Sequence, residues 1–144
     1  MNVISPLENM AGPGKTLSKE PPDYREFQGL LRSGLARLQD AGNPANSIEG
    51  RFDLVYNAAH ALSLAALRWH GYRPTNRYIV FQVIPHTLGL GPDVWRVLAK
   101  GHEIRNLGEY EGELNIDDRL LGDMLIAGKK LADAVAALSK NCKS

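Results

Sequence analysis

Apolar residues recur along most of the chain at spacings of three and four positions, which place them on one face of a helix. The first predicted helix begins at Asp23, because Asp23 and Glu26 have the spacing of a capping box, and it ends near Gly42. Its apolar stripe consists of Tyr24, Phe27, Leu31, Leu35 and Leu38. A second helix is expected from Ser47 to His70. Its apolar positions cover so much of the circumference that it should lie at the centre of a bundle.

The second half of the chain predicts further helices after a turn at residues 72–76. Residues 78–84 are rich in β-branched and aromatic side chains, which would also suit a strand, but a single strand would have no partner there. We therefore expect a short helix in this segment. Another helix should start at residues 91–93 and reach about Tyr110, and Asn115 could cap a last helix over about residues 116–140. The sequence thus predicts an all-α fold: an antiparallel bundle of four or five helices over residues 23–140.

Both ends of the chain lack this periodicity. Residues 1–22 contain several prolines and glycines and predict a flexible N-terminal tail or a partner-binding arm, and residues 141–144 predict a short C-terminal tail. The first residues have no charged start and apolar run typical of a secretion signal, and residues 58–67 are too short and too polar to span a bilayer. The chain has one cysteine, which cannot form an internal disulfide. We expect a cytoplasmic protein that does not associate with membranes.

Composition narrows the functional classes. Hydrophobic residues make up 44% and charged residues 23%, which is typical of a folded domain, and the net charge is +1. Such a balance gives no strong field for nonspecific binding to nucleic acid. The four histidines are scattered without the spacing of metal ligands, so we expect no metal and no other cofactor. Residues 12–16 resemble the end of a phosphate loop, but Asn9 stands where that loop needs its first glycine.

Arg105 is the most informative single residue. Counting about 100° per residue from Val94 places Arg105 about 20° away, at the edge of the apolar face of its helix. A guanidinium in that position needs an anionic ligand, a carboxylate or a partner subunit. An ion pair with Glu109, four positions later, would meet this need without any ligand. His102 lies one turn earlier on the same helix.

Two further polar groups lie near this part of the predicted bundle. One is a polar line on the second helix, within roughly 80° of arc, that faces either solvent or Arg105 across the bundle. It consists of Asp53, Asn57, His60 and Arg68. A histidine in such a place is more typically structural than catalytic. The other is a group of arginines and aromatic residues around the following turn, which suits either a solvated turn or phosphate contact and base stacking. It consists of Arg68, Trp69, Tyr72, Arg73, Arg77 and Tyr78.

Two segments resemble the HEPN domains, helical bundles named for higher eukaryotes and prokaryotes nucleotide-binding. Residues 56–74, YNAAHALSLAALRWHGYRP, resemble their second helix and turn. Residues 104–112, IRNLGEYEG, resemble their signature helix, in which an Arg-Asn pair precedes a histidine by a few residues. The resemblance covers about residues 23–140 and implies an antiparallel bundle that is usually dimeric. In active members, Arg and His of two subunits meet across a cleft and cut RNA without metal.

The match to that motif is incomplete. Arg105 and Asn106 fit it, but Tyr110 stands where active members carry the histidine. Tyrosine has an unperturbed pKa of about 10 and is a poor base at neutral pH, although Glu109 or His102 could replace it. The resemblance therefore implies a homodimeric, non-catalytic protein that binds a nucleotide or RNA or assists a nucleotidyltransferase.

The alternative is a metal-independent endoribonuclease of a toxin–antitoxin system, with an antitoxin partner and with Arg105 stabilising the transition state. A purely structural helical oligomer is the third interpretation. The candidate catalytic residues are Arg105, Asn106, Glu109 and Tyr110. The candidate binding residues are Asn57, His60, Arg68 and His102.

Overall fold

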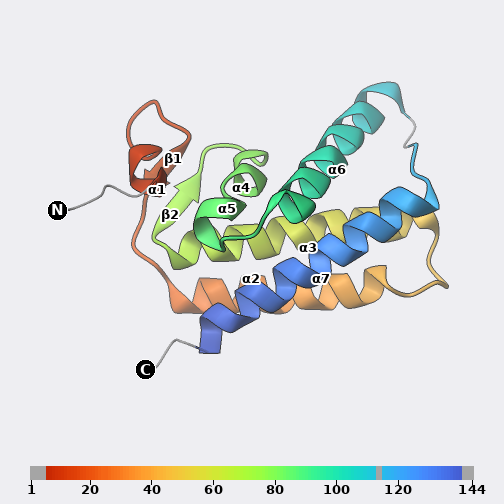
Figure 1. Cartoon of the computed structure of the whole chain (residues 1–144), viewed down its shortest axis with the longest axis horizontal. Helices are drawn as coiled ribbons and strands as arrows, with labels where there is room; N and C mark the ends of the chain where they lie inside the picture. Colours follow the sequence, from red (N-terminus) through yellow and green to blue (C-terminus); the bar gives the residue numbers. More distant parts are fainter. Residues whose placement is uncertain (1–5, 113–114, 141–144) are drawn as a thin grey trace.

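The predicted all-α bundle is confirmed by a computed structural model, which describes residues 6–112 and 115–140 (Figure 1). Four long helices form the body of the described chain. They are α2 (Tyr24–Ala41), α3 (Ile48–Trp69), α6 (Pro92–Glu111) and α7 (Asp118–Lys140). Shorter elements complete it: α1 (Pro6–Asn9), β1 (Leu17–Lys19), β2 (Tyr72–Pro74), α4 (Ile79–Gln82) and α5 (Ile84–Thr87). Among the described residues, no helix has the length and apolar character needed to cross a membrane.

The helix α3 lies at the centre, as its broad apolar surface predicts. It contacts α2, α6 and α7, and most of its side chains are buried. Small residues let the helices approach closely. A Cβ atom added at Gly34 of α2 would lie 2.6 Å from Cγ of Leu62 on α3, and one at Gly101 of α6 would lie 2.7 Å from the end of Met124 on α7. The core therefore depends on glycine at two helix crossings.

The starts of the long helices follow their capping residues, with one correction. Asp23 caps α2, where its Oδ1 accepts from the amides of Arg25 at 2.9 Å and Glu26 at 3.3 Å, and Ser47 caps α3. The predicted cap at Asn115 is wrong. Oδ1 of Asp117 accepts from the amide of Leu120 at 2.7 Å, so the chain turns into α7 two residues later.

The ambiguous segment 78–84 is helical, as expected, and forms α4 and the start of α5. Its apolar side chains Ile79, Val80 and Phe81 are buried against α3 and α6. The turn expected at residues 72–76 is instead partly extended, because β2 pairs with β1 in antiparallel register, Leu17 opposite Pro74.

That pairing overturns the expected N-terminal tail for the residues that the structure describes. Leu17 is fully buried and Leu7 is almost so, and the amide of Glu20 donates to the carbonyl of Gly71 at 3.0 Å. Gly71 has a φ of +87°, which allows the sharp exit from α3 that brings β2 beside β1. Residues 6–22 are therefore part of the fold. The remaining tail residues, 1–5 and 141–144, lie outside the described part.

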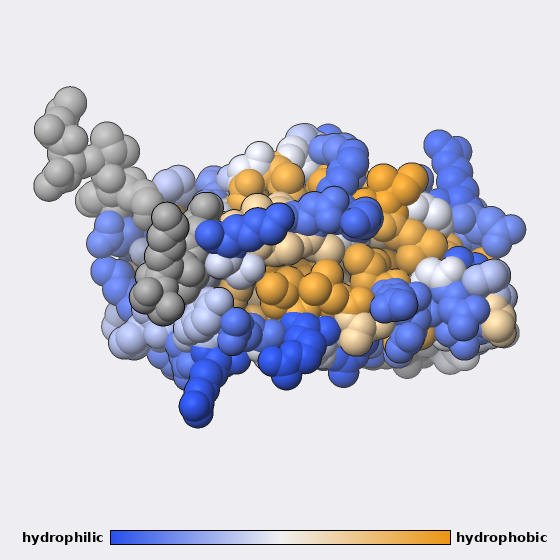
Figure 2. Space-filling view, turned by 90° about the horizontal axis from the view of Figure 1, so that it is seen from below, coloured by the Kyte–Doolittle hydropathy of each residue, from blue (hydrophilic) through white to orange (hydrophobic). Residues whose placement is uncertain are grey.

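The surface seen from below in Figure 2 carries a band of apolar residues, flanked by charged side chains, over the side of the bundle where α2 and α7 lie in Figure 1. Leu35 on α2 and Ile126 on α7 are among the large apolar residues that remain exposed. Most other apolar residues of these two helices face the core.

Candidate functional site

The structure brings Arg105 of α6 against the polar line of α3. Nη1 of Arg105 lies 2.5 Å from Oδ1 of Asp53, and the guanidinium carbon lies 4.6 Å from the centre of the Tyr56 ring. The side chain of Arg105 is 24% exposed and that of Asp53 is 56% exposed. Of the two orientations that the sequence left open for the polar line, Asp53 adopts the one that faces Arg105, at the rim of the bundle.

Helical spacing explains why these residues meet. On α3, Asp53, Tyr56 and His60 follow each other at intervals of three and four, so they share one side of the helix. On α6, His102 and Arg105 are separated by three positions and face the same side. The packing of α6 on α3 and α4 then brings the two faces together. Together with Arg77, from the turn before α4, the polar and aromatic residues of these two faces form a group of seven that we call the Arg105 cluster. They are Asp53, Tyr56, Asn57, His60, Arg77, His102 and Arg105.

His102 is held on both ring nitrogens. Its Nδ1 lies 2.8 Å from the hydroxyl of Tyr56, and its Nε2 lies 3.0 Å from Nδ2 of Asn106. With Asn106 donating to Nε2, a neutral His102 carries its proton on Nδ1 and donates it to the Tyr56 oxygen. The His102 ring also stacks on Tyr78, with centroids 4.9 Å apart. The orientation of His102 is therefore fixed by neighbours on α3, on its own helix α6 and in the turn before α4.

Positive charge dominates the neighbourhood of His60. The pKa of His60 is lowered to about 4, mainly by burial, and electrostatic interactions with Arg77, His102 and Arg105 contribute to this lowering. The guanidinium of Arg77 also lies over the Tyr56 ring, at 5.8 Å, and its Nη2 is 3.5 Å from Oδ1 of Asn57. Sequence analysis placed Arg77 only in the basic turn after α3. The structure shows that this turn folds back onto the Arg105 cluster.

The motif residues after Arg105 are only partly described. Asn106 lies on the exposed side of α6 and contacts His102. The backbone of α6 continues through Glu109 and Tyr110, but their side chains lie outside the described part of the structure. Their predicted roles stay predictions.

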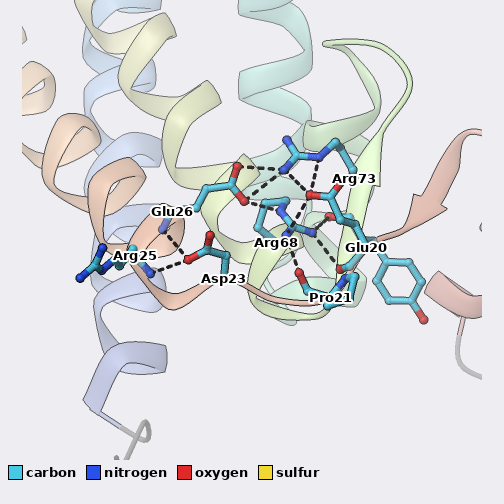
Figure 3. Close-up of polar contacts among 8 residues, drawn as sticks. Glu20, Pro21, Asp23, Arg25, Glu26, Arg68 and Arg73 are labelled. Carbon is cyan, nitrogen blue, oxygen red and sulfur yellow. Dashed lines mark hydrogen bonds and ion pairs between the residues drawn. The ribbon is translucent and has the colours of Figure 1, made fainter.

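Arg68, a predicted binding residue, is not part of the Arg105 cluster but forms ion pairs with Glu20 and Glu26 (Figure 3). Its side chain is 1% exposed, and all three of its nitrogens bind protein groups. Nε donates to Glu26 at 2.5 Å, Nη1 to the carbonyl of Glu20 at 3.0 Å, and Nη2 to the carbonyl of Pro21 at 2.7 Å. The hydrogen bond from Arg68 lowers the pKa of the Glu26 carboxyl. Arg68 thus holds the N-terminal segment against α3 through these hydrogen bonds. The spacing of residues along the sequence does not predict this contact.

The Arg105 cluster can bind an anion, because a guanidinium donates charge-assisted hydrogen bonds to phosphate and aromatic rings hold it in place. Among the residues that the structure describes, no three His, Cys, Asp or Glu side chains gather closely enough to hold a metal ion.

Comparisons of this chain with protein-family models, with curated proteins and with solved structures found no match.

Proposed function

We propose that this protein binds a phosphate-bearing ligand, a nucleotide or RNA, through the Arg105 cluster, as a non-catalytic HEPN-like protein. The observation that carries the proposal is that two guanidinium groups, those of Arg77 and Arg105, lie over the same tyrosine ring at 5.8 and 4.6 Å. Two cations that converge on one ring repel each other unless anions lie between or beside them. Asp53 provides one anion, and we propose that a ligand phosphate binds at the same place.

The charge of the neighbouring groups supports this proposal. His60 has a pKa of about 4, so it stays neutral at pH 7 and the two arginines supply the positive charge that would attract an anion. The chain as a whole is nearly neutral, with a net charge of +1. Binding should therefore depend on this local cluster. Neutralising two phosphates of a single strand gives a slope of about −1.4 in a plot of log affinity against log salt.

The test is fluorescence anisotropy with a fluorescein-labelled single-stranded RNA 10-mer and, separately, a labelled nucleoside triphosphate. Arg105→Ala and Arg77→Ala should each weaken binding about tenfold, because each removes charge-assisted hydrogen bonds. Arg96→Ala is the matched control, since Arg96 is an exposed arginine of the same helix that lies over Trp95 at 5.4 Å. Equal binding by wild type and Arg105→Ala would contradict the proposal, as would wild-type protein that binds neither probe.

The homodimer and the nucleotidyltransferase partner rest on the family resemblance. Sedimentation equilibrium at micromolar concentration should give twice the monomer mass of 15.8 kDa. A monomer under these conditions would contradict the dimer while leaving ligand binding intact. Coexpression with a nucleotidyltransferase encoded beside this chain should yield a stable complex.

A metal-independent endoribonuclease of toxin type is the second candidate, favoured by the position of His102 one turn before Arg105. In this reaction the ribose 2′-hydroxyl attacks the adjacent phosphate and gives its proton to a base, while the bond from phosphorus to the 5′-oxygen of the next nucleotide breaks. That oxygen takes up a proton from the conjugate acid or from water and leaves as a 5′-hydroxyl, and Arg105 stabilises the charge of the transition state. Wild-type protein should then cut RNA in EDTA, leaving 2′,3′-cyclic phosphate ends, and should inhibit growth when overexpressed. Arg105→Ala should abolish both effects. RNA binding without cleavage would exclude this candidate and keep the first.

A further inference from the structure

We propose that Asp53 makes the Arg105 cluster selective for ribose over deoxyribose, by accepting a hydrogen bond from the 2′-hydroxyl beside the bound phosphate. This inference rests on the proposed function, since it concerns the ligand of that same cluster. It assigns a specificity role to a residue that the sequence marked only as part of a polar line.

The position of Asp53 allows its carboxylate to contact the ribose of a bound ligand. Its Oδ1 lies 2.5 Å from Nη1 of Arg105, so any anion bound by that guanidinium comes close to the Asp53 carboxylate. More than half of the Asp53 side chain, 56%, is exposed. The Tyr56 ring covers one face of the Arg105 guanidinium, which directs a ligand toward the edge of the guanidinium near Asp53.

Electrostatics then restricts which ligand can fit. A phosphate bound to Arg105 and the neighbouring Asp53 carboxylate repel each other, and the two arginines of the cluster offset only part of that repulsion. A hydrogen-bond donor between them changes the contact from repulsive to attractive. In a ribonucleotide the 2′-hydroxyl is such a donor, close to the 3′-phosphate, and carboxylates commonly bind ribose hydroxyls in this way. Deoxyribose offers only C–H groups at the same position.

The experiment uses full-length protein and three fluorescein-labelled 10-mers of uridine that differ at one position of the sugar. They carry 2′-hydroxyl, 2′-hydrogen or 2′-O-methyl groups. Wild type should bind the 2′-hydroxyl strand about tenfold more tightly than either of the others, since a hydrogen bond to a charged acceptor contributes that much. The 2′-O-methyl strand is informative because it keeps the ribose oxygen and loses the donor.

Substitution of Asp53 should remove this preference. Asp53→Ala should bind all three strands within about twofold of one another, mainly because RNA binding weakens. Asp53→Asn, which keeps an acceptor oxygen without the charge, should retain part of the preference. Asp133→Asn is the matched control, since Asp133 is another exposed carboxylate in an ion pair, with Lys129 on α7. Circular dichroism and the thermal midpoint should confirm that each variant is folded.

Two outcomes would overturn the inference while leaving the proposed function in place. One is equal binding of the three strands by wild type. The other is tighter binding of all three strands by Asp53→Ala, which would make Asp53 only an internal competitor for Arg105. Failure of the proposed function has a different signature: neither wild type nor either Asp53 variant would bind any of the strands.

Discussion

Replacing Arg68 by methionine tests whether the buried guanidinium holds the N-terminal segment on the bundle. Methionine fills much of the space of the arginine stem but donates no hydrogen bond. The substitution leaves the carbonyls of Glu20, Pro21 and Tyr72 without their donor and removes one partner of the Glu26 carboxylate (Figure 3). The change therefore removes the buried cation of a hydrogen-bonded ion pair whose carboxylate, Glu26, is 30% exposed.

The expected cost follows from the contacts that survive. Breaking a buried ion pair by removing one partner costs about 3–5 kcal/mol. Arg73 still donates to Glu26 at 2.9 Å and to Glu20 at 2.5 Å, so neither carboxylate is left without a cation. We therefore expect the lower end of the range, about 3 kcal/mol. For a chain of this length, that loss lowers the midpoint of thermal unfolding by roughly 6–12 °C.

Urea unfolding followed by circular dichroism measures this free energy directly. Arg73→Met is the matched control, because Arg73 binds the same two carboxylates but its side chain is 37% exposed, and it should cost about 1 kcal/mol or less. Hydrogen exchange should show loss of protection in β1 for Arg68→Met. If Arg68→Met cost no more than Arg73→Met and β1 kept its protection, the buried guanidinium would not be what fastens this segment.

Two further predictions concern the core and its response to pH. Gly34→Ala should lower the free energy of unfolding by about 1–3 kcal/mol, because its Cβ would lie 2.6 Å from Leu62. Gly29→Ala in the same helix is the control: its Cβ would meet open space, so the substitution should be neutral or stabilising. Equal effects of the two substitutions in urea titrations would contradict this prediction. His60, with a folded-state pKa of about 4 against 6.5, stays neutral in the native protein while the unfolded chain gains a proton. Stability should therefore fall from pH 6.5 to 4, by less than about 3 kcal/mol given partial exposure, and His60→Gln should reduce this fall. An unchanged pH profile in the variant would refute it.

The long helices could be predicted because each carries several turns of apolar periodicity and a local capping signal. The residue type and spacing at Asp23 predict a helix cap, which the structure confirms, and the second helix begins at Ser47 as predicted. The segment before Asp23 has no such repetition. Leu7 and Leu17 are single apolar residues that become buried only because β2 lies beside β1, and strands of three residues leave no pattern to read.

Glu26 shows how a distant partner overrides a local rule. Its spacing from Asp23 predicts a side chain that reaches back to the start of α2. In the structure its carboxylate binds Arg68 and Arg73, which lie 42 and 47 positions further along the chain. A buried guanidinium needs a carboxylate more strongly than an exposed helix end needs a second cap. Residue spacing within one helix contains no information about that competition.

The contrast between Arg68 and Arg105 gives the physical basis for choosing a binding site. Both arginines lie on helices at the edge of apolar surface, and the sequence alone makes both candidates for a functional site. Arg68 is sealed from solvent and bound by carbonyls and carboxylates of its own chain, so a ligand would have to displace part of the fold. Arg105 is partly exposed, and Asp53, which it binds, is itself exposed and can rearrange at small cost. Exchange of a protein carboxylate for a ligand is therefore feasible at Arg105 and costly at Arg68, which is why we propose the α3–α6 rim as the binding site.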